Sequence, residues 1–231
     1  MNSSHVRPET MSKTEDRKTT EEFRNSCRTE FMAPPYSGKA HVAFLIVFCS
    51  SGIVLSLLNV QNLKQFEWLT VPISFLYSNL VEYLAHRYPM HHRWKVISIA
   101  YDRHTGLHHR FFTHEKMNID QWKEVRAILF PASLVILFFG IFLLPVLWGL
   151  SVLVSTNVAW LFSATAFAYY FLYEALHLTY HLNLPGVECL RLLHRIHHNP
   201  RLMRQVNFNI TFPICDWVFE TYSKSREPDS V

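Results

Sequence analysis

The sequence predicts an all-α fold: a four-span integral membrane helical bundle with a histidine-rich cap on its cytoplasmic side. Three features of the 231-residue chain support this prediction. It has four long apolar segments, its Lys and Arg residues are concentrated in alternate connections, and twelve of its fourteen histidines lie in clusters. A run of about 20 apolar residues is long enough to cross the hydrocarbon core of a bilayer as a helix. The pattern therefore favours a membrane protein over a soluble domain.

The four apolar segments differ in how cleanly they end. The first, residues 40–60, contains no Asp, Glu, Lys or Arg. The second runs from residue 66 to about residue 88 and has an acidic residue near each end. The third and fourth, residues 127–150 and 151–181, meet without an intervening charge. We therefore expect four spans, with the last two forming a tight helical hairpin.

The two ends of the chain are polar. Residues 1–39 are rich in Ser, Thr, Glu, Lys and Arg, a composition that predicts a disordered cytoplasmic tail. We expect one membrane domain over residues 40–222 and a short C-terminal tail over residues 223–231. No cleavable signal peptide is expected, because the first apolar run begins only after the long charged tail.

The basic residues predict the orientation of the spans. Seven Lys or Arg precede residue 40, eight lie between residues 87 and 126, and six follow residue 190, whereas the other two connections hold one and none. An even number of spans places these three basic regions on one side, and the positive-inside rule makes that side cytoplasmic. The net charge of +4 thus reflects topology, and no basic run is typical of nucleic-acid binding.

The histidine clusters fall on this same cytoplasmic side. They lie at the end of the second span, in the middle loop, at the end of the fourth span and in the C-terminal segment. Histidine is the commonest metal ligand in proteins. His5 and His41 lie apart from the clusters, and the roles of His92 and His114 are left open. The predicted cap is therefore a metal cap.

The spacing of the histidines favours a site for two ions. Three pairs are four residues apart and can share a helix face and one ion: His104 with His108, His177 with His181, and His194 with His198. Adjacent helical residues point about 100° apart, so the neighbours His108/His109 and His197/His198 suit two different ions. Pro89 disfavours helix at the residue before it, and a turn there can bring His91 back toward His86. Imidazole suits zinc, copper, iron and nickel, whereas calcium and magnesium prefer oxygen.

The motifs resemble those of the fatty acid hydroxylase/sterol desaturase superfamily of integral-membrane di-iron enzymes. "EYLAHRYPMH" at 82–91, "HTGLHHRFF" at 104–112, "HRIHH" at 194–198 and "NFNITFPICDWVF" at 207–219 resemble its histidine boxes and closing segment. The extra HxxxH at 177–181 is similar to the fatty acid 2-hydroxylase branch. Two departures are the three residues before His108 and the cysteine before Asp216, where the superfamily often has two residues and a tryptophan. The resemblance, which spans residues 40 to about 222, implies these metal ligands: His86, His91, His104, His108, His109, His177, His181, His194, His197 and His198.

The resemblance implies a membrane-bound oxygenase. Such an enzyme hydroxylates a lipid C–H bond, in a fatty acyl chain, a sphingolipid, a sterol or a similar lipid, with two iron ions and O₂. Zinc can replace iron in purified protein. Electrons must come from a separate donor of the cytochrome b5 or ferredoxin type, because no haem domain is fused to the chain. Glu82 and Glu174 are candidates for orienting the histidine rings, and a salt bridge to an interfacial arginine is the alternative for each.

Several alternatives remain open at this point. A desaturase would use the same centre and differ only in the fate of the substrate radical. A divalent-metal transporter is disfavoured, because transporters place their ligands near the bilayer midplane and these histidines lie at one edge. A non-catalytic membrane protein that holds a metal is the third alternative. The expected location is the endoplasmic reticulum membrane of a eukaryote or the inner membrane of a bacterium.

Overall fold

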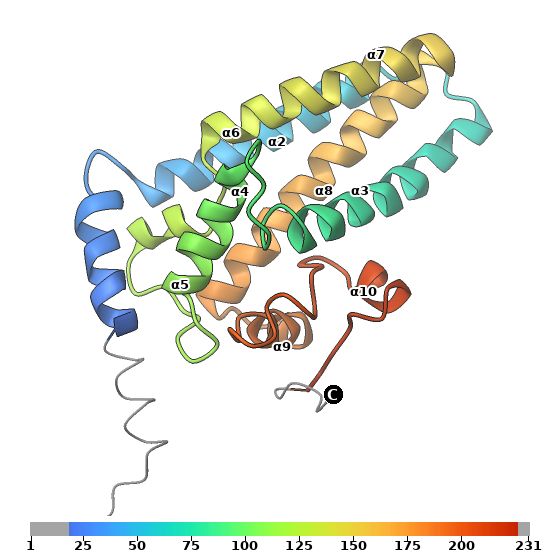
Figure 1. Cartoon of the computed structure of the whole chain (residues 1–231). Helices are drawn as coiled ribbons and strands as arrows, with labels where there is room; N and C mark the ends of the chain where they lie inside the picture. The colour runs from blue at the N-terminus through green and yellow to red at the C-terminus, as the bar shows by residue number, and fades with distance from the viewer. Residues whose placement is uncertain (1–18, 226–231) are drawn as a thin grey trace, which may run out of the picture.

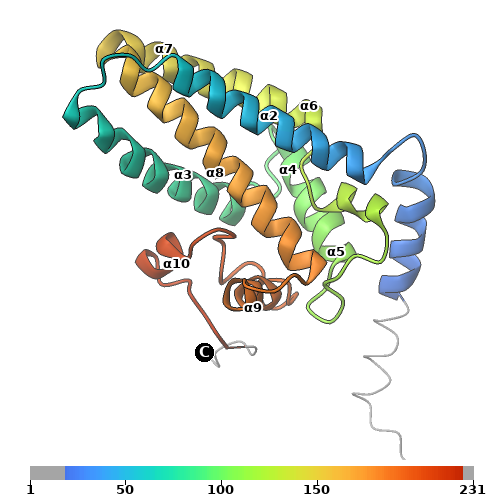
Figure 2. The same cartoon turned by 180° about the vertical axis from the view of Figure 1, so that it is seen from behind.

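A computed structural model describes residues 19–225. Helices and loops make up this part of the chain, and no strand forms between residues 19 and 225 beyond an isolated bridge of Thr113 with Lys116. Long helices lie side by side in an elongated bundle, and short helices and loops gather at one of its ends (Figure 1). The view from behind shows the same division into bundle and cap (Figure 2). The structure is therefore all-helical, as the sequence predicts.

Each of the four predicted apolar segments is helical. The bundle consists of α2 (Gly38–Leu58), α3 (Thr70–Arg87), a third segment made of α6 (Ala132–Phe138), the π-helix η5 (Phe139–Leu143) and α7 (Leu144–Leu153), and α8 (Thr156–Leu182). Ser37 and Ser155 cap the N-termini of α2 and α8 by accepting a backbone N–H. Helix α8 is central, because it packs against α2, α3 and α7.

Two helical stretches are long and apolar enough to cross a membrane: Gly38–Leu58 and Trp122–Leu153. Only 17% and 33% of their most apolar windows are buried within the protein. The core helix of a soluble protein would be mostly buried, so this exposure is consistent with a membrane protein. Helices α3 and α8 do not meet the same test, because acidic residues and histidines interrupt their apolar runs. Four spans therefore stay a prediction.

Close contacts join α2 to α8. The Ser56 hydroxyl donates a hydrogen bond to the Ser163 hydroxyl, 2.8 Å away. One turn earlier, Gly52 lies against the Phe167 ring so closely that a Cβ on this glycine would meet ring atoms at 2.5 Å. Small residues at such positions let helix backbones approach each other within a membrane. This contact packs α8 directly against α2.

A buried acid fastens the far end of the bundle. Glu67, in the 3₁₀-helix η2 (Gln65–Leu69), accepts hydrogen bonds from the Ser155 hydroxyl at 2.6 Å and from the Asn157 amide at 2.9 Å. The α2–α3 and α7–α8 connections therefore meet at this end, opposite the cap (Figure 1).

The cap is built from short elements. These are α4 (Ser98–Arg103), the π-helix η3 (His104–His108), α5 (His109–Phe111), the 3₁₀-helix η4 (Trp122–Ala127), α9 (Glu188–His197) and α10 (Ile214–Val218). They lie beside the C-terminal ends of α3 and α8 (Figures 1 and 2). The histidines at 104–109 follow α3 in the chain, and those at 194–198 follow α8. The fold thereby brings the four histidine motifs to one end of the molecule.

The N-terminal region differs from the prediction. Residues 19–26 are helical and continue into the π-turn η1 (Cys27–Phe31), although the sequence predicts disorder through residue 39. Arg24 is fully buried and pairs with Asp120 and Glu124. Polar composition predicts disorder when charges stay in water. Here the charges are paired with residues nearly one hundred positions later in the chain, so the segment folds. Residues 1–18 and 226–231 of the predicted tails lie outside the described residues.

Candidate metal centre

Ten buried histidines meet in two groups inside the cap. Each residue offers one ring nitrogen, and the five nitrogens of a group lie within 4.8 Å of one another. None of the ten residues is more than 6% exposed. The first group is His86, His91, His104, His109 and His197, and the second group is His108, His177, His181, His194 and His198. These are the ten histidines that the sequence predicts as ligands. The structure brings them together, and their role as ligands stays a prediction.

A π-helical turn decides which histidines share a group. The spacing of His104 and His108 predicts that they share one ion, but they fall in different groups. Residues His104–His108 form a π-helix, in which the hydrogen bonds connect residues five apart. His109 therefore lies beside His104, and their Nε2 atoms are 3.0 Å apart. The sequence reasoning assumed an α-helix here, and that assumption was wrong.

Adjacent histidines are divided between the groups. His108 and His109 belong to different groups, and so do His197 and His198, as their roughly 100° separation on a helix predicts. The two remaining i,i+4 pairs, on α8 and α9, each stay within the second group.

The turn at Pro89 brings His91 back against His86. The structure places the centres of the two imidazole rings 5.1 Å apart. The chain leaves the α-helix just before this proline, with Tyr88 as the C-cap of α3. The prediction that this turn returns His91 to His86 is confirmed.

Backbone carbonyls set the tautomers of five rings. A carbonyl oxygen can only accept, so a ring nitrogen bonded to it must carry the proton, and the other nitrogen of a neutral imidazole keeps its lone pair. Here Nδ1 donates and Nε2 faces the group. The carbonyl partners are Phe208 for His86, Ala127 for His108, Met117 for His181, Val206 for His197 and Phe112 for His198.

Lone pairs consequently face each other inside each group. In the second group, the Nε2 atoms of His108 and His198 are 3.1 Å apart and neither has a proton to donate. In the first group, the Nε2 atoms of His91 and His197 are 3.0 Å apart, and again neither carries a proton. The Nδ1–H of His91 donates to the Thr105 hydroxyl, whose own proton goes to the Met90 carbonyl. A cation between the nitrogens would turn this repulsion into attraction.

Protonation does not resolve the conflict. Burial, followed by the neighbouring histidines, lowers the pKa of His108 and of His198 well below the ordinary value for histidine. Burial also lowers the pKa of His197 to about 4. The rings are therefore neutral near pH 7, which is the form that binds a metal ion.

The nitrogen spacing fits metal ions. Hydrogen-bond-length Nε2–Nε2 separations within the groups range from 2.8 Å for His86–His104 to 3.2 Å for His181–His194. Two imidazole nitrogens that lie about 2.1 Å from one ion at right angles are about 3.0 Å apart. Each group of five neutral nitrogens could thus hold one transition-metal ion, and the two groups together could hold two.

Glu82 supports the site through the backbone. The sequence predicts that Glu82 orients His86 or pairs with an arginine, but the structure shows neither. Its carboxylate accepts the backbone N–H groups of Ile210 and Thr211, and the hydroxyls of Thr211 and Tyr169. The reason is that His86 Nδ1 already donates its hydrogen bond to the Phe208 carbonyl. Glu82 instead holds the backbone segment that follows Phe208.

Asp216 is a second support that sequence reasoning did not assign. It accepts the backbone N–H groups of Phe208 and Asn209 at 2.9 and 2.8 Å, and the hydroxyl of Thr221 at 2.7 Å. Its place in the closing segment that resembles the superfamily was the one available signal. Together with Glu82 it fixes the loop that presents the Phe208 carbonyl to His86.

Glu174 likewise forms no hydrogen bond with a histidine ring among the described residues. Its Oε1 accepts the Phe130 N–H at 3.2 Å and the Tyr170 hydroxyl at 2.6 Å. The structure shows neither a hydrogen bond from Glu174 to His177, three residues later, nor a salt bridge within residues 19–225, so the orienting role of Glu174 stays a prediction. Glu174 instead anchors the backbone where the third helical segment begins.

Comparison with known proteins agrees with this geometry. The sequence model of the Fatty acid hydroxylase family matches residues 71–221, which is more than half of the chain and includes all ten histidines. The chain belongs to the fatty acid hydroxylase family. Comparison with curated proteins and with solved structures finds no match. Membership implies an oxidoreductase with a metal-dependent site, and the two histidine groups are the residues that could bind the metal.

The other histidines of this fatty acid hydroxylase family member lie outside the groups. His41 bonds to the Tyr36 hydroxyl and the Phe130 carbonyl, both at 2.9 Å. His92 contacts the Arg87 carbonyl at the surface, and His114 belongs to neither group. His5 lies outside the described residues.

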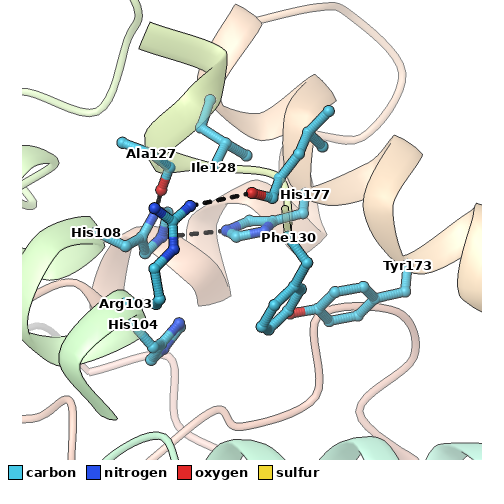
Figure 3. A pocket seen from close by; sticks show the side chains of 9 residues that line it. Arg103, His104, His108, Ala127, Ile128, Phe130, Tyr173 and His177 are labelled. Carbon is cyan, nitrogen blue, oxygen red and sulfur yellow. Dashed lines mark hydrogen bonds between the residues drawn. The ribbon is translucent and has the colours of Figure 1, made fainter. Parts of the chain in front are cut away.

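A small cavity opens next to both histidine groups. His104 of the first group and His108 and His177 of the second line it, with Arg103 and Tyr173 (Figure 3). The rest of the wall is the apolar segment 127–130. One Arg103 nitrogen donates to the carbonyls of residues 126 and 129, and no carboxylate within residues 19–225 forms an ion pair with it. The cavity therefore combines an apolar wall, one cation and three candidate ligands.

Proposed function

We propose that this protein is a membrane-bound di-iron oxygenase that hydroxylates a C–H bond of a lipid. The reaction consumes O₂, two electrons and two protons, and yields the hydroxylated lipid and water. The electrons come from a separate protein of the cytochrome b5 or ferredoxin type. One observation carries the proposal: in a fatty acid hydroxylase family member, two sets of five buried histidines each bring five ring nitrogens within 4.8 Å of one another.

Four membrane spans are part of the proposal. Helix α3 exposes apolar side chains such as Ile73 (64%) and Leu76 (53%) along its length, which is expected of a lipid-facing surface. Helix α8 is shielded by α2, α3 and α7, so its polar residues face the protein. With four spans, the positive-inside rule puts the histidine cap in the cytoplasm. The membrane is that of the endoplasmic reticulum in a eukaryotic cell and the inner membrane in a bacterium.

The protein's own residues would position and protect the reaction. Backbone carbonyls hold five histidine rings with Nε2 toward the ions, and burial keeps the rings neutral. Bound iron would supply the reduction of O₂ and the oxidation of the C–H bond. The apolar wall of the cavity, which includes Ile128 and Phe130, keeps bulk water from the reacting carbon.

The cavity suggests how the lipid binds. Its apolar wall is chemically suited to hydrocarbon. The lining segment 127–130 leads into α6, and Tyr173 and His177 lie on α8. Arg103 has donors left after bonding two carbonyls, so it can bind an acceptor group of the lipid. A substrate that enters sideways from the bilayer would thereby place a C–H bond beside His104 and His177.

The experiment that tests the proposal measures metal and product together. The full-length protein, purified without chelator, is analysed for metal per chain by mass spectrometry, beside His108→Ala and His109→Ala. These adjacent residues belong to different groups, so each variant is expected to lose one ion and the double variant both. His92→Ala, which alters a histidine outside the groups, is the control and keeps two ions.

Product analysis decides the reaction. Iron-loaded protein in vesicles, with a reductase system and ¹⁸O₂, is expected to incorporate one labelled oxygen atom into a membrane lipid. Loss of two hydrogens without label would mean that the centre desaturates lipids instead. Fewer than two ions in the unaltered chain, with no change in either variant, would refute the dinuclear site and the oxygenase with it.

A further inference from the structure

The N-terminal helix of this chain packs against the cap, and one of its residues, Arg24, bonds to the backbone of a cap loop. Arg24 lies in the helical stretch 19–26, which precedes the region 71–221 that matches the family. It is 0% exposed, although arginine is almost never fully buried unless it is paired. The partners of this buried guanidinium therefore show which part of the cap it stabilises.

Arg24 bonds to both ends of one cap loop. Its guanidinium donates to the Phe111 carbonyl at 3.0 Å and to the Asn118 carbonyl at 3.5 Å. It also lies over the Phe111 ring, 4.3 Å from the centroid. Asp120 and Glu124 balance its charge at 3.0 and 3.3 Å. The loop 111–118 is therefore closed at both ends by a single side chain.

That loop presents two carbonyls to the second histidine group. The Phe112 carbonyl accepts the Nδ1–H of His198 at 2.5 Å, and the Met117 carbonyl accepts that of His181 at 2.6 Å. The Phe112 ring also packs on the His181 ring, with centroids 4.3 Å apart. Both carbonyls lie between the two points that Arg24 holds. Their positions decide where two of the five Nε2 atoms of this group point.

We propose that Arg24 is a positioning residue for the second metal ion, and that the N-terminal helix is thus part of the catalytic centre. The inference rests on the proposed function, in that it assumes the second group binds metal. Arg24 makes no contact with the loop that serves the first group, where Phe208 and Val206 supply the carbonyls and Glu82 and Asp216 hold the backbone. Its effect is therefore confined to one of the two ions.

Arginine is required for geometric reasons. Its planar fork reaches two carbonyls and two carboxylates at once, whereas lysine has three donors on a single nitrogen. Arg28 is a natural comparison, because it binds the same acids, Asp120 and Glu124, at 2.7 Å each. Its hydrogen bonds go to side chains and to no carbonyl of the loop 111–118. Arg28→Gln is thus a matched control that loses ion pairs to the same acids and keeps both hydrogen bonds of Arg24 to the loop carbonyls.

The test measures the affinity of each group separately in the full-length chain. His86→Ala disables the first group and His177→Ala disables the second, so each background reports on one ion. Arg24→Gln, Arg24→Lys and Arg28→Gln are placed in both backgrounds. Each protein is titrated with Co²⁺, whose visible absorption reports the number and arrangement of its ligands. Thermal unfolding and gel filtration of every variant check that the chain remains folded.

Arg24→Gln is expected to weaken Co²⁺ binding about 10- to 100-fold in the His86→Ala background, the usual effect of losing an outer partner of a ligand. The Co²⁺ spectrum should also change there, and Arg24→Lys should restore neither. In the His177→Ala background, and with Arg28→Gln, affinity and spectrum should not change. Equal weakening of both groups, or an unaltered second group, would overturn the inference. If neither background binds Co²⁺ even with Arg24 present, the proposed function itself fails.

Discussion

Replacing Glu82 tests whether this acid acts through the backbone. Glu82→Leu keeps the bulk of the side chain and removes all four hydrogen bonds that its carboxylate accepts. The hydroxyls of Tyr169 and Thr211 can turn to each other, because their oxygens are already 2.6 Å apart. The N–H groups of Ile210 and Thr211 have no such alternative and would be buried unpaired.

The cost follows from those two N–H groups. A buried donor left without a partner costs about 1–3 kcal/mol, so Glu82→Leu should destabilise the fold by about 2–6 kcal/mol. For a chain of this size that lowers Tm by on the order of 10 °C. Glu82→Gln should cost less, about 1–2 kcal/mol, because its amide oxygen can accept both N–H groups and the hydroxyls can accept from its NH₂.

Two assays separate this explanation from a direct role on His86. Thermal unfolding in detergent gives the difference in Tm, and metal analysis gives the occupancy of each group. Glu82→Leu should lose metal from the first group before the second, since the loop it releases presents the Phe208 carbonyl to His86. Equal effects of Glu82→Leu and Glu82→Gln on Tm and metal content would show that the charge, and not the hydrogen-bond pattern, matters, and would refute the reasoning.

Three further predictions concern the cavity, the metal and the bundle. Arg103→Gln should raise KM of the metal-loaded protein for the lipid about 10-fold or more, because one charge-assisted hydrogen bond is removed. Arg93→Gln, at an exposed arginine paired with Asp102, should not change KM. Equal KM in both variants would contradict the assigned role. Removal of metal by a chelator should lower Tm, because the facing lone pairs 3.0–3.1 Å apart then repel. Adding metal back at 100 times its Kd should restore about 2.7 kcal/mol of unfolding free energy. An unchanged Tm would count against the metal centre. Gly52→Ala should destabilise the bundle by about 1–3 kcal/mol, since its Cβ would meet the Phe167 ring at 2.5 Å; Gly149→Ala meets nothing within 4 Å and is the control in the same unfolding assay.

The histidine set was open to sequence reasoning because ligand chemistry is local. His177/His181 and His194/His198 lie on α-helices, where residues four apart share a face, and the structure keeps each pair in one group. The same logic failed at His104 and His108, because a π-turn has a different period and its hydrogen bonds depend on the surrounding packing. Spacing and the resemblance to the superfamily therefore singled out the residues, and spacing misassigned one partner.

The supporting groups were not open to sequence reasoning. Glu82 lies one helical turn before His86, which favours direct contact, yet its partners are 128 and 129 residues away. The role of Arg24 was hidden in the same way. The polar composition around it predicts disorder, whereas its hydrogen bonds to residues 111 and 118 form only in the folded chain. Neither local composition nor periodicity reports on such long-range hydrogen bonds.

By itself, the sequence determined the helical class, the four apolar segments and the ten histidines that meet in the cap. These depend on hydrophobic length and on residue chemistry, which neighbouring residues encode. Only the tertiary structure decided how the ten histidines divide into two groups of five, which carbonyls set their tautomers, and which distant residues hold those carbonyls. The physical reason is that a lone pair is aimed by the hydrogen bond on the opposite side of its ring, and in this protein that bond comes from backbone brought close only by folding.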